Sequence, residues 1–261
     1  MTAPIYPQLG SGALSQFPVQ KRRKLRTVRN VSEDGRHVRL SDPTGTTTEW
    51  RLTYDDLTDL EMATIHDFFA VAEGTLNSFT FLDPTDNLLA NSDELDHPVW
   101  EAGPLLTLSK GETDPKGGLS AWRLSNRGDG VQSLSQSLGV PGSYLYCFSV
   151  YVKSLTATNV AMVFGSQRTT RAVTPAWNRI EFSTRDLGVG PMAFGLELAA
   201  GSVLDVYGMQ VEPQARASGF KSTGRGGVYE GARLADDLLA VTTLGQNCHS
   251  CTVNIIHVDH L

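Results

Sequence analysis

The sequence is poor in the features that mark several large classes of protein. It holds three cysteines in 261 residues, too few for a disulfide framework, which favours synthesis in a reducing compartment. No segment approaches the roughly 20 consecutive apolar residues that cross a membrane. The first 20 residues lack the charged start and apolar core of a secretory signal. These absences exclude a disulfide-stapled scaffold, and we expect no insertion into a membrane.

Positive charge is also scarce. The formal net charge is -6, which argues against a generic nucleic-acid binder, so we expect no nucleic-acid partner. Apolar residues make up 40% and charged residues 19%, a balance typical of a globular protein with one or two cores. The 25 glycines and 12 prolines interrupt the chain often, as in proteins built from many short strands.

The motifs of common enzymes are missing. None of the six histidines accompanies a G-x-S-x-G or H-E-x-x-H motif, and no phosphate loop or dinucleotide fingerprint is present. We therefore expect no catalytic residue, no cofactor and no enzymatic activity. One alternative stays open, because two carboxylates can flank a glycosidic bond in enzymes that act on polysaccharides. The acidic residues that would supply such a pair are Asp93, Glu94, Asp96 and Glu101.

A C-x-x-C spacing occurs at Cys248 and Cys251. A structural zinc ion needs four ligands, and the sequence has no second C-x-x-C, although His257 and His260 follow closely. A thiol redox motif would open a helix, whereas this one precedes a strand-like segment. We interpret residues 248–251 as a surface turn between paired strands, and we predict no metal site.

A basic stretch lies near the start of the chain. Only Glu33 and Asp34 oppose its cationic residues, which are Lys21, Arg22, Arg23, Lys24, Arg26, Arg29, Arg36 and Arg39. One interpretation is a basic arm that meets an acidic surface or a phosphate backbone. The simpler interpretation is a solvated edge strand, because basic residues on edges discourage unwanted pairing. A contact with an acidic neighbouring subunit fits either geometry.

The first 85 residues predict strands around one helix. Residues 1–20 are interpreted as an extended segment that packs along a partner surface. Strands are expected at 36–40 and 46–54, on either side of a turn at 41–45, and at 77–82. Thr58 and Glu61 form a capping box, and Gly74 is suited to end a helix that spans about 58–73.

The middle of the chain changes to short strands separated by turns. From about residue 90 to 214 this rhythm predicts an antiparallel sandwich. In the last of these strands, alternation predicts one shared face, on which Asp205 would need a partner or a position at the rim. The expected members of that face are Val203, Asp205, Tyr207, Met209 and Val211.

Two more strands are expected near the end, at 238–243 and 252–260. The last 40 residues are too few for an independent domain, so we expect them to return to the first one. The predicted domains are therefore a discontinuous one, 1–85 and 222–261, and an inserted one, 86–221. The fold class is mainly β: a discontinuous β-barrel or sandwich hub domain with one short α-helix, plus an inserted antiparallel jelly-roll sandwich.

Aromatic residues of the middle segment are the candidate binding residues. Flat rings can stack on the apolar face of a sugar, while polar groups fix its hydroxyls. The other interpretation places the same rings in the sandwich core. The candidate carbohydrate-binding residues are Trp100, Trp122, Tyr146 and Trp177.

Several of these segments resemble a known group of proteins. The Trp50, Leu52 and Tyr54 strand, the helix that ends in Phe68-Phe69 and Gly74, and the strand of Phe79 and Phe81 resemble distal-tail or minor-tail hub proteins of bacteriophages and gene transfer agents. The final segments 231–245 and 252–258 resemble the closing strands of such hubs. The middle segment resembles carbohydrate-binding jelly rolls of phage tail and fibre proteins.

The resemblance implies a structural role in a virion. Distal-tail proteins form rings, usually hexamers, that join the tail tube to the tail tip or baseplate, so the implied partners are other copies of this chain and those tail proteins. Assembly would take place in the host cytoplasm and the final location would be the virion tail. The inserted domain would contact host-surface glycans. The alternative function is a stand-alone carbohydrate-binding protein.

Overall fold

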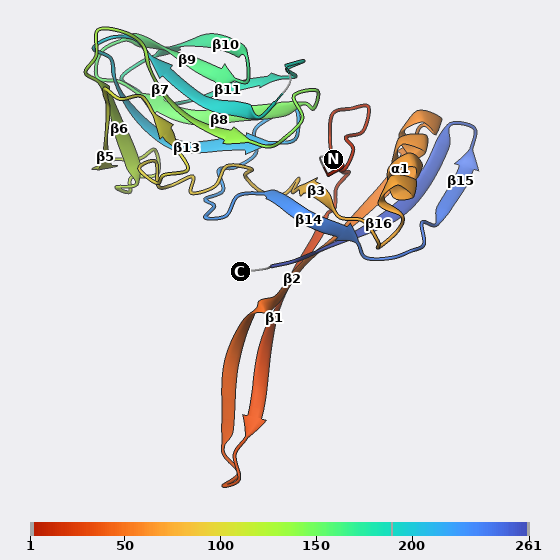
Figure 1. Ribbon diagram of the computed structural model, residues 1–261. Coiled ribbons are helices and arrows are strands. Elements are labelled where there is room, and N and C mark those ends of the chain that lie inside the picture. Colours follow the sequence, from red (N-terminus) through yellow and green to blue (C-terminus); the bar gives the residue numbers. More distant parts are fainter. Residues whose placement is uncertain (1–2, 189, 260–261) are drawn as a thin grey trace. The chain divides into compact units, whose positions relative to one another are not determined.

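A computed structural model describes residues 3–188 and 190–259, apart from the side chain of Pro43. The chain is mainly β with one helix, as predicted from the sequence (Figure 1). It divides into two compact units: unit 1 comprises Met1–Phe81 and Tyr229–Leu261, and unit 2 comprises Leu82–Val228. Among the described residues, none of the helices is long and apolar enough to span a membrane.

Unit 1 is built on one sheet whose main path is β1-β2-β16-β14-β3, with β15 also paired to β16. Among the described residues, β1 and β3 lie at the two ends of that path. Its strands are β1 (Gln20–Val31), β2 (His37–Leu57), β3 (Phe79–Leu82), β14 (Val228–Leu234), β15 (Val241–Gly245) and β16 (Cys248–Val258).

The hairpin of β1 and β2 departs from the prediction. The expected turn at 41–45 is part of one continuous strand, and the chain reverses instead at 32–36. Gly35 makes that reversal possible with a φ of +78°, and its N–H donates to the carbonyl of Ser32 at 2.8 Å. β16 pairs β2 only from Thr47 to Leu57. The remaining part of the hairpin therefore extends beyond the sheet as a two-stranded ribbon (Figure 1).

The predicted helix is confirmed as α1 (Asp59–Ala72). Thr58 is its N-cap, and both hydrogen bonds of the capping box with Glu61 are present. At the other end Glu73 and then Gly74 take left-handed conformations, with φ of +49° and +61°, which stops the helix. The strand with Phe79 and Phe81 is also confirmed, and both rings are fully buried.

Part of the N-terminal segment packs into unit 1. Tyr6 and Leu14 are each 1% exposed, because they pack into the core of unit 1. The hydroxyl of Tyr6 lies 3.0 Å from that of Tyr54, and its ring packs against Phe68 and Phe81. The segment therefore completes its own unit.

Unit 2 is the predicted antiparallel sandwich. One sheet has the order β10-β9-β12-β7-β4 and the other has the order β11-β8-β13-β6-β5. From β6 to β9 and again from β10 to β13, each successive strand changes sheet, as in a jelly roll. The strands are β4 (Glu101–Ala102), β5 (Leu106–Glu112), β6 (Ala121–Asn126), β7 (Gln132–Leu138), β8 (Tyr146–Lys153), β9 (Thr158–Phe164), β10 (Gln167–Val173), β11 (Asn178–Thr184), β12 (Met192–Leu198) and β13 (Val203–Glu212).

A bulge in β13 corrects the predicted face of that strand. Tyr207 is paired with Tyr151, but the next paired residue is Gln210, so the strand gains one residue on the way. Gly208 provides the left-handed conformation there, with a φ of +68°. The bulge keeps Met209 fully buried, whereas a regular strand would place it on the side of Asp205 and Tyr207.

Asp186 ties two loops of unit 2 together and makes its stability sensitive to acid. Its carboxylate accepts hydrogen bonds from the backbone N–H groups of Ser166 and Gly188, at 2.5 and 2.9 Å. These donors hold the pKa of Asp186 below its ordinary value. Because the folded pKa is the lower one, ionisation stabilises the fold above the unfolded pKa of about 3.9, and this contribution disappears as the pH falls through the folded pKa.

We predict that Asp186→Asn lowers the melting temperature of the protein at pH 7, and that the difference from the wild type shrinks below about pH 4. Thermal unfolding followed by circular dichroism between pH 7 and pH 2 measures both. Asp129→Asn, at an exposed turn, is the control and should change little at any pH. A difference for Asp186→Asn that stays constant over the whole range would contradict the assigned role of the charge.

Candidate functional site

One surface of unit 2 combines partly exposed aromatic rings with charged side chains. On β8, Phe148, Val150 and Val152 are fully buried, so the alternating residues Tyr151 and Lys153 lie on the opposite side of the sheet. Strand pairing places Asp205 and Tyr207 of β13 beside them. We call this surface the aromatic face, and define it as Arg123, Tyr151, Lys153, Trp177, Arg179, Asp205 and Tyr207.

A shared carboxylate lies at one end of the aromatic face. Asp205 is 2% exposed and accepts a hydrogen bond from Arg123 Nε at 2.8 Å, and Lys153 Nζ lies 3.4 Å from its other oxygen. Arg123 also donates to Glu112 at 2.9 Å. The hydrogen bond with Asp205 raises the pKa of Arg123 further above its ordinary value. A buried Asp205 was expected to need a partner. Its partners are Arg123 and Lys153, which lie on the two neighbouring strands β6 and β8.

Each ring of the aromatic face has a cation close to it. Lys153 Nζ is 5.0 Å from the centre of the Trp177 ring, and the Arg179 guanidinium is 5.2 Å from that of Tyr151. The rings of Tyr151 and Tyr207 are 6.0 Å apart. All three rings are partly exposed. Cation contacts and ring packing together restrict how these side chains can rotate.

A loop anchored on Glu212 borders the same face. Glu212 is fully buried and accepts hydrogen bonds from the backbone N–H of Ser218 at 2.8 Å and from Gln210 at 2.7 Å. This anchor holds the segment that contains Phe220, whose ring packs against Tyr207 at 5.2 Å. A Cβ at Gly208 would come within 3.0 Å of the Phe220 ring, so the glycine of the bulge also makes room for this contact.

Arg179 is held by hydrogen bonds within unit 2. Its two terminal nitrogens donate to neutral oxygens, the carbonyl of Ser218 and the hydroxyl of Ser149. Its Nε is buried without a hydrogen-bond partner. Among the described residues no carboxylate forms an ion pair with it.

The structure places three of the four predicted sugar-binding residues in the core. Trp100 and Trp122 are 5% and 4% exposed, and their ring nitrogens donate to backbone carbonyls of Asn91 and Asp93, each at 3.0 Å. Tyr146 is fully buried, and burial raises its pKa well above the ordinary value. In this conformation none of these three can present an open ring to a sugar.

Trp177 is the one predicted residue that lies on the aromatic face. Tyr151 and Tyr207 are not among the four predicted carbohydrate-binding residues. A signal for Tyr151 exists, since it alternates with the apolar residues Val150 and Val152 and precedes Lys153. For Tyr207, regular alternation would place Met209 on the same side of the sheet. The bulge at Gly208 changes this side for the residues that follow Tyr207.

The C-x-x-C residues lie in a strand, not in the predicted turn. Cys248 and Cys251 belong to β16, and the reversal before it includes Asn247 with a φ of +56°. Burial raises the pKa of Cys251 to about 11, and a contact with Asp56 raises that of Cys248, so both thiols are protonated at neutral pH. Within the described residues, no group of three His, Cys, Asp or Glu side chains could hold a metal ion, and His260 lies outside them.

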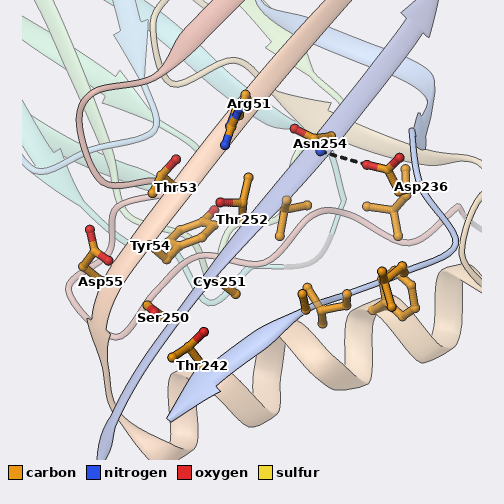
Figure 2. A pocket seen from close by; sticks show the side chains of 16 residues that line it. Arg51, Thr53, Tyr54, Asp55, Asp236, Thr242, Ser250, Cys251, Thr252 and Asn254 are labelled. Carbon is orange, nitrogen blue, oxygen red and sulfur yellow. Dashed lines mark hydrogen bonds between the residues drawn. The ribbon is translucent and has the colours of Figure 1, made fainter. Parts of the chain in front are cut away.

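Unit 1 contains a cavity of about 610 Å³ beside β2 and β16. The chain between β14 and β15 also lines this cavity. There the side chain of Asp236 accepts a hydrogen bond from that of Asn254 at 2.8 Å (Figure 2). Asp55 lines it from β2, Phe69 lines it from α1, and Leu238 adds an apolar side chain that is 77% exposed. This mixture of charged, polar and exposed apolar side chains suits contact with another protein surface better than it suits enclosure of a small molecule.

Comparison with solved structures finds proteins similar to about half of this chain. No protein-family model and no curated protein sequence match the chain. A xylan-binding CBM22-1 domain from Paenibacillus barcinonensis Xyn10C superimposes with a TM-score of 0.40 and 15% identity over 51% of this chain and 97% of that domain. A family 22 carbohydrate-binding module of Clostridium thermocellum Xyn10B gives a TM-score of 0.40 and 17% identity over 52% and 99%.

The enzymatically active domain of tailspike protein 4 from bacteriophage CBA120 gives a TM-score of 0.37 and 13% identity over 51% of this chain. This chain spans only 22% of that protein. Solved structures similar to about half of this chain thus include carbohydrate-binding modules and a phage tailspike domain. At these identities and TM-scores, neither a ligand nor an activity can be transferred to this chain.

The shared carboxylate of Asp205 is expected to stabilise unit 2. Asp205→Asn should lower the free energy of unfolding by about 3 kcal/mol, because it leaves Arg123 and Lys153 without their common anion. Chemical denaturation with urea measures the loss. The control is Glu197→Gln on the other sheet, whose ion pair with Arg168 is more exposed and should contribute less than about 1 kcal/mol. Equal losses in the two variants would show that Asp205 is not a structural centre of the face.

Proposed function

We propose that unit 2 binds glycans through the aromatic face. The observation that carries the proposal is the set of three partly exposed rings, Tyr151, Trp177 and Tyr207, next to fixed charged and polar groups. Tyr and Trp rings pack on the apolar C–H faces of sugars, while nearby donors and acceptors bind the hydroxyl groups. A sheet surface that offers both suits an extended sugar chain.

The face is organised before any ligand arrives. Asp205 holds Arg123 and Lys153, Lys153 lies over Trp177, and Arg179 lies over Tyr151. Binding therefore needs little ordering of side chains, which lowers its entropic penalty. Arg179, for which no ion pair exists among the described residues, favours glycans that carry carboxylates over neutral ones. We propose binding without catalysis, so no sugar chain should be cleaved.

The test is affinity gel electrophoresis and calorimetry of the full chain with a panel of polysaccharides. The panel holds neutral glycans, including xylan and β-1,4-galactan, and uronate-bearing glycans. We expect the wild type to bind at least one glycan, and Trp177→Ala or Tyr151→Ala to weaken that binding by about tenfold or more. An assay for new reducing ends on the bound glycan should stay at background.

Leu119→Ala is the matched control, because Leu119 is 69% exposed and lies outside the aromatic face. It should bind like the wild type. Thermal unfolding of each variant checks that the sandwich is intact. A folded wild type that binds none of the panel, or ring variants that bind as well as the control, would refute the proposal.

A second candidate function is that of a structural subunit of a phage tail, and the β1–β2 hairpin favours it. Every residue of β1 except Val28 is exposed, and Leu25 and Leu40 are 69% and 51% exposed. A two-stranded hairpin is marginally stable in water by itself, so such a ribbon calls for a partner surface. A ring-forming subunit that joins the tail tube to the tip or baseplate would provide one.

For this candidate we expect the purified chain to form closed rings or to join isolated tail tubes. Replacement of residues 26–42 by a short turn should abolish both. Electron microscopy detects the rings, and co-sedimentation with isolated tail tubes measures binding to the tubes. The glycan panel shows whether unit 2 of the shortened chain still binds glycans. Full association without the ribbon would remove the support that the hairpin gives.

A further inference from the structure

The strand β15 lacks the features that keep the edge of a sheet unpaired. Among the described residues it pairs only with β16, and every residue of β15 is exposed (Figure 1). Its sequence, VTTLG, has no charged residue and no proline. Sheet edges are commonly protected by lysine, proline or inward-pointing charges, because the free backbone groups of an edge accept other strands. β15 is therefore open to a further strand.

The other exposed edge of the same sheet is built differently. β1 lies at one end of the main path and has six basic residues among its twelve, a composition that discourages pairing. On and beside β15, by contrast, apolar side chains are accessible: Leu238 is 77% exposed, Val241 is 42% exposed and Leu244 is 68% exposed. A strand added to β15 would remove part of this apolar surface from water, which favours its binding.

One side of β15 borders the cavity of unit 1. Thr242 lines this cavity together with Ser250, its ladder partner on β16 (Figure 2). The lining is mainly polar, and its charged members are Arg51, Asp55 and Asp236. The two carboxylates outnumber the single guanidinium, so this side of β15 is weakly acidic.

The opposite side of β15 also borders a carboxylate. Thr243 lies there because successive side chains of a strand alternate. Its hydroxyl is 3.0 Å from Nδ1 of His249. Nε2 of the same imidazole is 2.7 Å from a carboxylate oxygen of Asp59, whose side chain is 69% exposed. Accessible carboxylates therefore lie on both sides of β15.

The chain around β15 is acidic over long stretches. Residues 52–81, which include the end of β2, α1 and β3, hold six acidic residues and no Lys or Arg. Residues 234–258, which include β15 and β16, hold two acidic residues and again no Lys or Arg. Arg51 and Arg233 border these stretches. Electrostatic attraction therefore favours an approaching strand with basic side chains and repels an acidic one.

We propose that an extended basic segment of another protein adds to β15 as a further strand. Its backbone would pair with the free edge, while its Lys or Arg side chains would face Asp55 and Asp236 on one side and Asp59 on the other. The basic strand of this chain, β1, is already paired with β2, so we assign the added strand to a different protein. The interaction goes beyond glycan binding and uses no residue of the aromatic face or of the β1–β2 ribbon.

The probe is a short synthetic peptide in which pairs of Lys alternate with pairs of Val, so that both sides of the strand carry both kinds of side chain. In one matched peptide Glu replaces each Lys. In a second the backbone nitrogens of the Val residues are methylated, which removes hydrogen-bond donors from the ladder. Calorimetry with the full chain should show the Lys peptide binding at least about tenfold more tightly than either. Added salt should weaken that binding.

The edge variant, Asp55→Lys with Asp236→Lys, reverses the charge at two exposed positions that line the cavity. It should bind the Lys peptide at least about tenfold more weakly than the wild type does. The matched control, Asp96→Lys with Glu101→Lys, makes the same change of charge at exposed positions of unit 2 and should bind like the wild type. Thermal unfolding checks that both variants are folded, and neither should lose glycan binding.

Four results would overturn the proposal. The first is a wild type that does not bind the Lys peptide at low salt. The second is equal affinity for the methylated peptide, because the charges would then attract it without strand addition. The third is an edge variant that binds the Lys peptide as tightly as the control does. The fourth is a wild type that dimerises in sedimentation velocity and excludes the Lys peptide, which would assign β15 to a second copy of the chain.

Discussion

Backbone pairing between β2 and β16 is the constraint on which unit 1 depends. The register runs from Thr47 with Val258 to Leu57 with His249, so it joins segments about 200 residues apart in the chain. The loop-closure entropy of so long a connection grows only slowly with length, and the connection here is folded into a compact unit. The N–H of Asp83 donates to the carbonyl of Gly227 at 2.8 Å, so the two ends of unit 2 lie side by side. A unit with adjacent ends can be inserted without distorting the sheet that carries it.

In unit 2, the pairing of β8 with β13 decides which side chains form the aromatic face. Alternation sends Val150 and Val152 into the core and leaves Tyr151 and Lys153 outside. The bulge at Gly208 then resets this alternation, so that Tyr207 before it and Gln210 after it lie on the same side of the sheet. One glycine thus decides both the composition of the face and the position of the Phe220 ring beside it.

Charge has different consequences in the two units. In unit 2, Asp205 is shared by Arg123 and Lys153, which compensates a buried carboxylate over a few ångströms and rigidifies the face. In unit 1 the exposed basic residues of β1 and the acidic residues of 55–73 occupy separate segments of the sequence. The first arrangement stabilises the aromatic face.

Features of short range were predictable from the sequence. The capping box of Thr58 and Glu61, the paired rings of Phe79 and Phe81, and the many short strands of the middle segment depend on neighbours within a few residues. The turn expected at 41–45 was wrong although its composition is typical of turns. Pairing with β1 keeps that segment extended, and the glycine of the neighbouring reversal, Gly35, permits the tighter change of direction.

The sequence by itself determined the class of the fold, its helix, and the need of Asp205 for a partner or a position at the rim. Tertiary structure alone decided which aromatic rings are accessible. Trp100 and Trp122 are buried and their ring nitrogens donate to the carbonyls of Asn91 and Asp93, whereas Tyr151 is partly exposed beside Arg179. A ring is buried or exposed according to strands and loops that are distant in the sequence, whereas propensity and alternation report only on local neighbours.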